Sequence, residues 1–385
     1  MEPLIIVGSG LAGYTVAREF RKYDKTTQII MVTQDSGDFY SKPMLSNAFA
    51  QKKSAEQLVA SPAQTMVEQI NMTLLAHAQL QAIDTVQREV ATSLGRYRYG
   101  KLVLALGADP VRLPLAGNAA ERVLSVNDLR DYAQFRAKLG NAKRVVVIGA
   151  GLIGCEFAND LLAAGIVPTV VDPSPYPLSS LLPEVAATAV RKALEAAGVV
   201  WRFGTTVASV DVDTPADAEQ GDGLRVRLSD GSELQADLVL SAVGLRPRTA
   251  LAAAAGIAVQ RGIVVDAQGR TSAEDVYALG DCAEYADGVL PYVLPIMTAA
   301  RAIAQTLAGT PTPIVFAPMP VSVKTPAHPV SVQPVKQGAD GAWEIAVSED
   351  SGLKLLFTDA AGQVRGFVLT GSRTAERAAV VKMLA

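Results

Sequence analysis

The sequence predicts an α/β protein with two Rossmann-like dinucleotide-binding domains and a small α+β domain near its C-terminal end. Residues 4–13 (LIIVGSGLAG) and 145–154 (VVVIGAGLIG) each place the spacing G-x-G-x-x-G between an apolar strand and a helical pattern. A proline-rich run at 310–320 then precedes a shorter region with its own strand and helix patterns. The length of 385 residues is sufficient for two or three domains.

The first fingerprint opens a βαβ unit. Residues 4–7 read as a buried strand, Ala12 to about Lys22 as a helix, and 28–33 as a second strand. A Rossmann unit usually has an acid at the end of that second strand to bind ribose hydroxyls. Here Thr33 takes that place and Asp35 follows two residues later, so Asp35 is the candidate for the adenosine ribose. A plain turn-capping role for Asp35 is equally open.

The second fingerprint restarts the pattern after an apolar strand at 101–110. Its second strand, at 168–173, ends in Asp172, about 20 residues past the first glycine, which is the expected position for the ribose-binding acid. A carboxylate there accepts hydrogen bonds from a free 2′-hydroxyl and repels a 2′-phosphate, so we expect NADH to be preferred over NADPH. Residues 224–244 predict a hairpin around an Asp-Gly turn and then a buried strand.

The last part of the chain predicts short elements. Residues 295–307 read as a helix with proline in its first turn. Beyond the proline-rich run, 353–371 suggest two strands joined by a turn, and about 374–384 a closing helix.

Composition limits the chemistry. A hydrophobic fraction of 49% and a net charge of −3 describe an ordinary soluble globular chain without the ~20-residue apolar run that spans a membrane. The first strand begins at about Leu4, so we expect no signal peptide and a cytoplasmic location; without a basic run, we expect no nucleic-acid partner. Cys155 and Cys282 form no C-x-x-C pair and are expected to be small buried residues. With only His77 and His328 we expect no metal site, so organic cofactors must supply the chemistry.

Three further segments, together with the two fingerprints, resemble the FAD-dependent pyridine nucleotide oxidoreductases. They are 102–110 (LVLALGADP), 238–249 (LVLSAVGLRPRT) and 271–284 (TSAEDVYALGDCAE). In the first, leucine replaces the threonine of the family's A-T-G segment. The resemblance implies that Asp281 hydrogen-bonds the ribityl chain of FAD. The domains that we expect are a discontinuous FAD-binding domain at 1–110 and 236–310, an NAD-binding domain at 111–235, and a C-terminal domain at 311–385.

Residues 40–46 (YSKPMLS), 151–161 (GLIGCEFANDL) and 321–330 (VSVKTPAHPV) narrow this resemblance to bacterial rubredoxin reductases, the NADH-dependent flavoproteins of alkane hydroxylation. The resemblance implies that NADH reduces FAD and that electrons then pass one at a time to rubredoxin. A flavorubredoxin, or a [2Fe–2S] ferredoxin, stays open as the acceptor, and an NADH-responsive redox sensor is the rival class. Because the third domain is small, we expect a monomer.

The resemblance also suggests the site residues. It places Lys42 and Glu156 beside the flavin as the catalytic residues, where they can form a pair, with Lys324 as a further charge nearby. The start of the helix at 295–307 would face the flavin. The full set of expected cofactor-binding residues is Gly8, Ser9, Gly10, Leu11, Ala12, Gly13, Thr33, Asp35, Lys42, Pro43, Leu106, Gly107, Gly149, Gly151, Leu152, Ile153, Gly154, Glu156, Asp172, Gly244, Gly280, Asp281, Val293 and Lys324. The basic residues that could steer an acidic carrier are Lys42, Arg246, Arg248, Arg301, Lys324 and Lys336.

Overall fold

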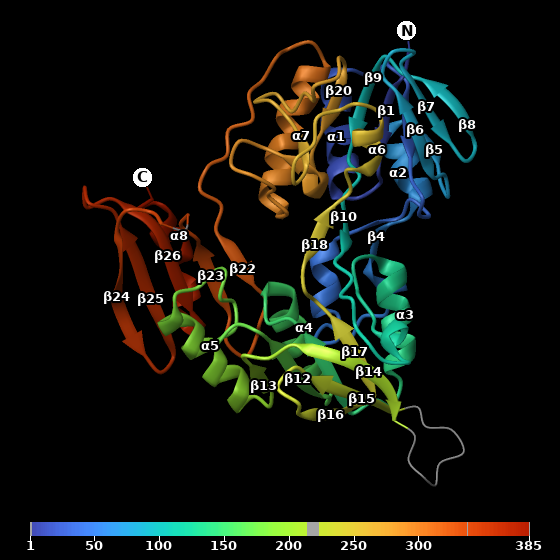
Figure 1. Cartoon of the computed structure of the whole chain (residues 1–385). Helices are drawn as coiled ribbons and strands as arrows, with labels where there is room; N and C mark the ends of the chain where they lie inside the picture. Colours follow the sequence, from blue (N-terminus) through green and yellow to red (C-terminus); the bar gives the residue numbers. More distant parts are fainter. Residues whose placement is uncertain (1, 214–222, 337, 385) are drawn as a thin grey trace. The chain divides into compact units, whose positions relative to one another are not determined.

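The computed structural model describes residues 2–213, 223–336 and 338–384 (Figure 1). The chain forms two compact units, each assembled from three segments. Unit 1 comprises Met1–Ser41, Val59–Asp109 and Leu245–Met319, and unit 2 comprises Lys42–Leu58, Pro110–Gly244 and Pro320–Ala385. The chain therefore passes from one unit to the other five times along its length.

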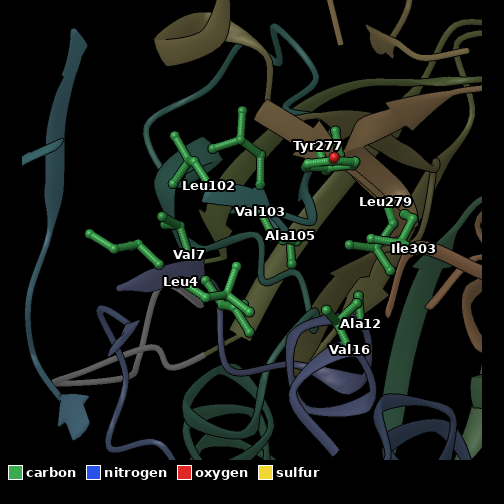
Figure 2. Close-up of a cluster of buried hydrophobic side chains, with 14 of the residues drawn as sticks. Leu4, Val7, Ala12, Val16, Leu102, Val103, Ala105, Tyr277, Leu279 and Ile303 are labelled. Atoms are coloured by element: carbon green, nitrogen blue, oxygen red, sulfur yellow. The ribbon is translucent and has the colours of Figure 1, made fainter. Parts of the chain in front are cut away.

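Unit 1 is built on a five-stranded parallel sheet in the order β20-β9-β1-β2-β5. Its central strands are apolar on both faces, as in parallel sheets covered on both sides. Side chains of β1, β9 and β20 and of the helices α1 and α7 meet in one core, where Ala12, Val16 and Ile303 lie close to Leu279 (Figure 2). These elements are β1 Leu4–Val7, α1 Leu11–Tyr23, β2 Ile29–Val32, β5 Thr73–Leu75, β9 Lys101–Leu104, β20 Val276–Ala278 and α7 Val293–Leu307.

Smaller elements complete unit 1. They include an antiparallel meander, β6-β7-β8, and three two-stranded pairs, β3-β4, β10-β18 and β19-β21, which are separate from the five-stranded sheet. Their bounds are β3 Phe39–Tyr40, β4 Val59–Ser61, α2 Ala63–Ile70, β6 Leu80–Asp84, β7 Glu89–Thr92, β8 Gly95–Arg98, β10 Ala108–Pro110, β18 Leu245–Pro247, α6 Ala250–Ala254, β19 Ile263–Val264 and β21 Ala283–Glu284.

Unit 2 contains a second parallel sheet, β13-β12-β11-β17, with an antiparallel hairpin sheet, β14-β15-β16. The hairpin turns at Asp230 and Gly231, as the sequence predicts. The elements are α3 Leu129–Leu139, β11 Arg144–Ile148, α4 Leu152–Ala163, β12 Val167–Asp172, α5 Glu184–Ala196, β13 Val200–Phe203, β14 Val207–Asp213, β15 Gly223–Leu228, β16 Glu233–Ala236 and β17 Leu238–Ser241.

The C-terminal region also belongs to unit 2, where its antiparallel sheet, β22-β23-β26-β25-β24, contacts α5 through β25 and β26. The sequence predicts two of these strands, β25 and β26, and misses the other three. The closing helix is shorter than expected, because a 3₁₀ turn at Gly371–Glu376 precedes it. The bounds are β22 Val321–Val323, β23 Val330–Gln333, β24 Ala342–Glu349, β25 Gly352–Thr358, β26 Val364–Thr370 and α8 Arg377–Val381.

The predicted fold class is confirmed: two Rossmann-like sheets and a small C-terminal domain of mixed strand and helix. Two features of the chain's path differ from the expected division. The return to unit 1 comes at Leu245 rather than at 236, because β17 pairs with β11 inside the sheet of unit 2. Residues 42–58, which we call the arm, pack with unit 2 although unit 1 precedes and follows them.

Candidate functional site

The glycine turn of unit 1 has three glycines with three different surroundings. Gly8 has φ +113°, and a Cβ there would lie 2.1 Å from the carbonyl oxygen of Ala105. A Cβ on Gly13 would lie 1.9 Å from the carbonyl oxygen of Gly8, so this glycine lets α1 lie against the turn. A Cβ on Gly10, by contrast, would meet nothing within 4 Å. The open position is the middle glycine, where a pyrophosphate must approach the backbone.

Unit 2 repeats this arrangement at the start of α4. Gly149 has φ +104° and stands against the carbonyl of Ala242, while a Cβ on Gly154 would lie 1.9 Å from the carbonyl oxygen of Gly149. The middle glycine, Gly151, again faces open space. Both turns therefore fit a dinucleotide, and both lead directly into a helix N-terminus that favours phosphate.

The residue after β2 in unit 1 and the last residue of β12 in unit 2 make different hydrogen bonds to the glycine turns. In unit 2, Asp172 accepts hydrogen bonds from the backbone amides of Ala150 at 2.6 Å and Ser174 at 2.8 Å. In unit 1, the hydroxyl of Ser9 donates to that of Thr33 at 2.8 Å, and the Asp35 amide donates to Thr33 at 3.3 Å. The structure thus places the carboxylate of Asp172 at its turn, whereas buried Thr33 has this position in unit 1.

The remaining expected residues of unit 1 follow the carboxyl ends of adjacent strands. Gly8 follows β1, Gly107 follows β9 and Asp281 follows β20, and these three strands are neighbours in the sheet. In open α/β sheets, ligands bind outside the carboxyl ends of the strands. Arg248 stabilises the segment after β9, because its guanidinium donates to the carbonyl of Leu106 at 3.1 Å. Val293, the first residue of α7, is exposed.

Glu156 is the most completely buried charged group of the expected site. Its side chain is on α4 and is 0% exposed. One carboxylate oxygen accepts from the Lys324 amide at 2.8 Å, and the other accepts from the Ser46 hydroxyl at 2.5 Å and from the Lys324 ammonium. A buried carboxylate is stable only when a cation and hydrogen-bond donors compensate for lost water.

Glu156 therefore does not pair with Lys42, contrary to what the sequence resemblance implied. Lys324 takes that place, since its own main-chain amide already binds the same carboxylate. Lys42 is exposed, and its ammonium donates to the Asn127 side chain at 3.3 Å. Among the candidate steering residues, Lys324 is thus paired with Glu156, and Arg248 lies 2.6 Å from Asp109 in another ion pair.

The two cysteines are buried, as expected, and burial raises the pKa of both thiols, that of Cys282 to about 11. Neither is suited to act as a thiolate nucleophile at neutral pH. Within residues 2–213, 223–336 and 338–384, no cluster of three His, Cys, Asp or Glu side chains could bind a metal ion. In the same ranges, no helix combines the length and apolar character of a membrane span.

Sequence reasoning missed four polar residues that hold the site together: Ser46, Asn127, Asn159 and Asp160. A signal for two of them was available. Glu156, Asn159 and Asp160 are spaced i, i+3, i+4 on a helix that is otherwise mostly apolar, which predicts a single polar stripe. Such a stripe on a buried helix must find hydrogen-bond partners in other segments.

The two sheets and their glycine turns define an oxidoreductase that binds two dinucleotides. Residues 2–306 match the family model described as pyridine nucleotide-disulphide oxidoreductase, and residues 313–384 match the rubredoxin binding C-terminal domain. The chain belongs to the pyridine nucleotide-disulphide oxidoreductase family. Its members use FAD together with a nicotinamide dinucleotide, and FAD and NADH are the cofactors here.

Two curated relatives carry the same name. The chain is 46% identical to the rubredoxin-NAD(+) reductase of Alcanivorax borkumensis, over 100% of this chain and 99% of that protein. It is 44% identical to the rubredoxin-NAD(+) reductase of Acinetobacter baylyi, over 97% of this chain and 95% of that one. A nitric oxide reductase FlRd-NAD(+) reductase of Aeromonas hydrophila is 40% identical, over 96% and 93%.

Among solved structures, a ferredoxin reductase of Rhodopseudomonas palustris superposes with a TM-score of 0.88 at 27% identity, covering 98% of this chain and 93% of that one. The NADH:rubredoxin oxidoreductase of Clostridium acetobutylicum superposes with a TM-score of 0.80 at 19% identity, covering 99% and 93%. The second likeness concerns the fold alone.

Proposed function

We propose that this chain is an NADH-dependent FAD flavoprotein that passes electrons one at a time to rubredoxin. The observation that carries this proposal is the match of residues 313–384 to the rubredoxin binding C-terminal domain, within a chain that is 46% identical over its whole length to a rubredoxin-NAD(+) reductase. A role in alkane hydroxylation remains an expectation of the sequence resemblance.

In this proposal each unit holds one dinucleotide. FAD would be bound by the Gly8–Gly13 turn, by Thr33 and Asp35, and by the segments around Gly107 and Asp281. NADH would be bound by the Gly149–Gly154 turn and Asp172. When bound, FAD supplies the chemistry of accepting electrons in pairs from NADH and releasing them singly.

The protein's own residues supply position and charge. Glu156 is fixed by its bonds to Ser46 and Lys324, and we propose that it orients the groups of the bound cofactors nearest to α4. Lys324 balances the buried carboxylate. Lys42 presents an exposed ammonium from the first turn of Lys42–Asn47, and we propose that it contacts the flavin when FAD is bound.

Two finer proposals concern the state of the protein in the cell. We propose that it is a monomer, in line with the small third domain, which size-exclusion chromatography with light scattering would test. We also propose a cytoplasmic location, which the two free cysteines favour, because free thiols are typical of reducing compartments.

An anaerobic stopped-flow experiment tests the acceptor. The FAD-loaded protein is reduced with one equivalent of NADH and then mixed with oxidised rubredoxin, with a flavorubredoxin or with a [2Fe–2S] ferredoxin. Fast reoxidation by rubredoxin is the expected result. Fast reoxidation by ferredoxin alone, or by flavorubredoxin alone, would replace the proposed acceptor, and no reaction with any carrier would favour a redox sensor.

A further inference from the structure

The arm, residues 42–58, packs on two helices of unit 2, α4 and α3. It begins with the 3₁₀ turn Lys42–Asn47, which packs on α4 and α3. Both ends of the arm continue into unit 1. Within unit 2, the arm brings Ser46 to Glu156 of α4 and Lys42 to Asn127.

A second buried carboxylate, Asp160, lies one helical turn beyond Glu156 and is 1% exposed. Its two oxygens accept hydrogen bonds from two consecutive arm amides, that of Ala50 at 2.8 Å and that of Phe49 at 3.0 Å. Burial raises the pKa of Asp160, and the hydrogen bonds from these amides oppose that rise. The structure shows no other bonded segment for this carboxylate among the described residues.

The ring of Phe49 fixes the same point of the arm. It lies edge-on to Tyr132 and Phe135 of α3, with ring centroids 6.3 and 6.2 Å apart. The guanidinium of Arg136 covers its face at 4.2 Å from the centroid. Main chain and side chain are thus both held at one residue, seven positions along the chain from Lys42.

The choice of a carboxylate has a physical reason. Burying a charge costs several kcal/mol, which a neutral side chain would avoid. The two arm amides, however, donate to different oxygens of Asp160, and only an ionised carboxylate offers an acceptor on both atoms. An asparagine in this place would direct one N–H group against a backbone N–H.

We propose that Asp160 is a positioning residue for the reduction of the flavin by NADH. It holds the arm against α4. In this way it fixes the positions of Lys42 and Ser46, which are on the arm, relative to Glu156, which is on α4 like Asp160. The inference rests on the proposed function, because these residues act on cofactors only if the chain is an NADH-dependent flavoprotein.

The test compares Asp160→Asn with a control elsewhere in unit 2, Asp237→Asn, in the FAD-loaded full chain. Asp237 also accepts from two consecutive backbone amides, those of Lys143 at 2.8 Å and Arg144 at 2.9 Å, at the start of β11. Both amides bind one oxygen, and the other oxygen lies 2.8 Å from the Arg144 guanidinium, so the control removes a carboxylate–amide contact that has no part in the arm. Two quantities are measured: hydrogen exchange of peptides covering 44–54, and the anaerobic rate of flavin reduction against NADH concentration.

We expect Asp160→Asn to lose protection in the arm and to lower the limiting rate of flavin reduction about 10- to 100-fold, because small displacements at a site carry such costs. The Kd for NADH should stay within about twofold, since the glycine turn is untouched. The control should keep both arm protection and rate. Normal reduction with a deprotected arm, or slow reduction with a protected arm, would overturn the proposal.

Phe49→Leu covers the case in which Asp160→Asn does not fold. It removes the ring contacts and leaves the carboxylate, so arm exchange should rise and the limiting rate should fall in the same direction; an unchanged rate with a deprotected arm overturns the clamp. Failure of the proposed function is distinguishable, because wild-type flavin that NADH does not reduce would leave the exchange result unaffected.

Discussion

At the scale of single residues, the interactions of Glu156 decide how the predicted site is assembled. The sequence resemblance gave Lys42 as the partner of Glu156 and Lys324 as a further charge nearby, whereas in the structure Lys324 is the partner. Periodicity cannot identify the partner, because the hydrogen-bond donors to this carboxylate, Ser46 and Lys324, lie on segments distant from Glu156 in sequence. The backbone amide of Lys324 holds that lysine at the carboxylate. Lys324 directly follows β22, so its position depends on the C-terminal sheet, which a local sequence pattern does not describe.

A double-mutant cycle tests this pairing. Lys324→Met leaves the carboxylate of Glu156 buried without its cation and should lower the free energy of unfolding by about 3 kcal/mol. Combined with Glu156→Gln, the loss should be smaller than the sum of the single losses by at least about 1 kcal/mol. Lys42→Met combined with Glu156→Gln should instead be additive within about 0.5 kcal/mol. Denaturant unfolding of the FAD-loaded protein measures both cycles, and coupling in the Lys42 cycle alone would contradict this pairing.

Asp172 carries a second prediction at this scale. Asp172→Ala removes the carboxylate that we propose binds the ribose and also releases the Ala150 amide, so both nucleotides should bind more weakly. The preference is the informative quantity. We expect the ratio of kcat/KM for NADH to that for NADPH to fall at least about tenfold, a change of ~1.4 kcal/mol. An unchanged ratio would remove Asp172 from the ribose site.

At the scale of elements, the three glycines of each turn separate ligand binding from folding. The middle position has an ordinary backbone conformation in both turns, with φ −75° at Gly10 and −72° at Gly151. At the third glycine of each turn, a Cβ would lie 1.9 Å from a backbone carbonyl oxygen. The motif predicts different roles for the three glycines, and the structure shows the contacts on which each role depends.

Gly10→Val should therefore fold but purify without FAD, because the new side chain occupies the space a pyrophosphate needs. Gly13→Ala should not fold, since its Cβ would lie 1.9 Å from the carbonyl oxygen of Gly8. Circular dichroism and flavin absorbance distinguish these outcomes. Gly151→Val is the matched control: it should stay yellow and be reduced by dithionite but not by NADH. Full flavin content in Gly10→Val would contradict the site.

Long apolar or periodic segments were the predictable elements. The strand at 4–7 has the predicted bounds, α1 is one residue longer at each end than predicted, and α7 begins two residues earlier and ends at the predicted residue. The missed strands β22, β23 and β24 lack such patterns: β22 and β23 are short, and most side chains of β24 are exposed. The edge strand β24 buries too little apolar surface to leave a clear periodic signal, and β22 and β23 are too short to show a period.

At the scale of the whole molecule, the fingerprints do not contain all that a dinucleotide site requires. Helix α7 packs on α1, and its residues Ala300, Ile303 and Leu307 are buried in the core of unit 1. The Lys101 ammonium also donates to the carbonyl of Leu307 at 2.7 Å. The far end of unit 1 in sequence therefore supports its first helix.

Two truncated chains test this dependence. A chain of residues 1–319 keeps all of unit 1, whereas a chain of residues 1–290 keeps both glycine turns and Asp281 but lacks α7. We expect the first to retain FAD and the second to purify colourless, because removal of α7 exposes the apolar face of α1. Flavin absorbance per protein measures this. A yellow 1–290 chain would show that α7 is dispensable.

The five passages of the chain between units also set an order of events on the ribosome. The parallel sheet of unit 2 uses strands from Arg144 to Ser241, so it can pair as soon as that stretch emerges. Four strands of the unit 1 sheet lie within the first 104 residues of the chain, but the edge strand β20 and the helix α7 are translated only after the whole sheet of unit 2. The face of α1 that α7 covers therefore stays uncovered until late in translation, and flavin loading becomes a late step in the maturation of the protein.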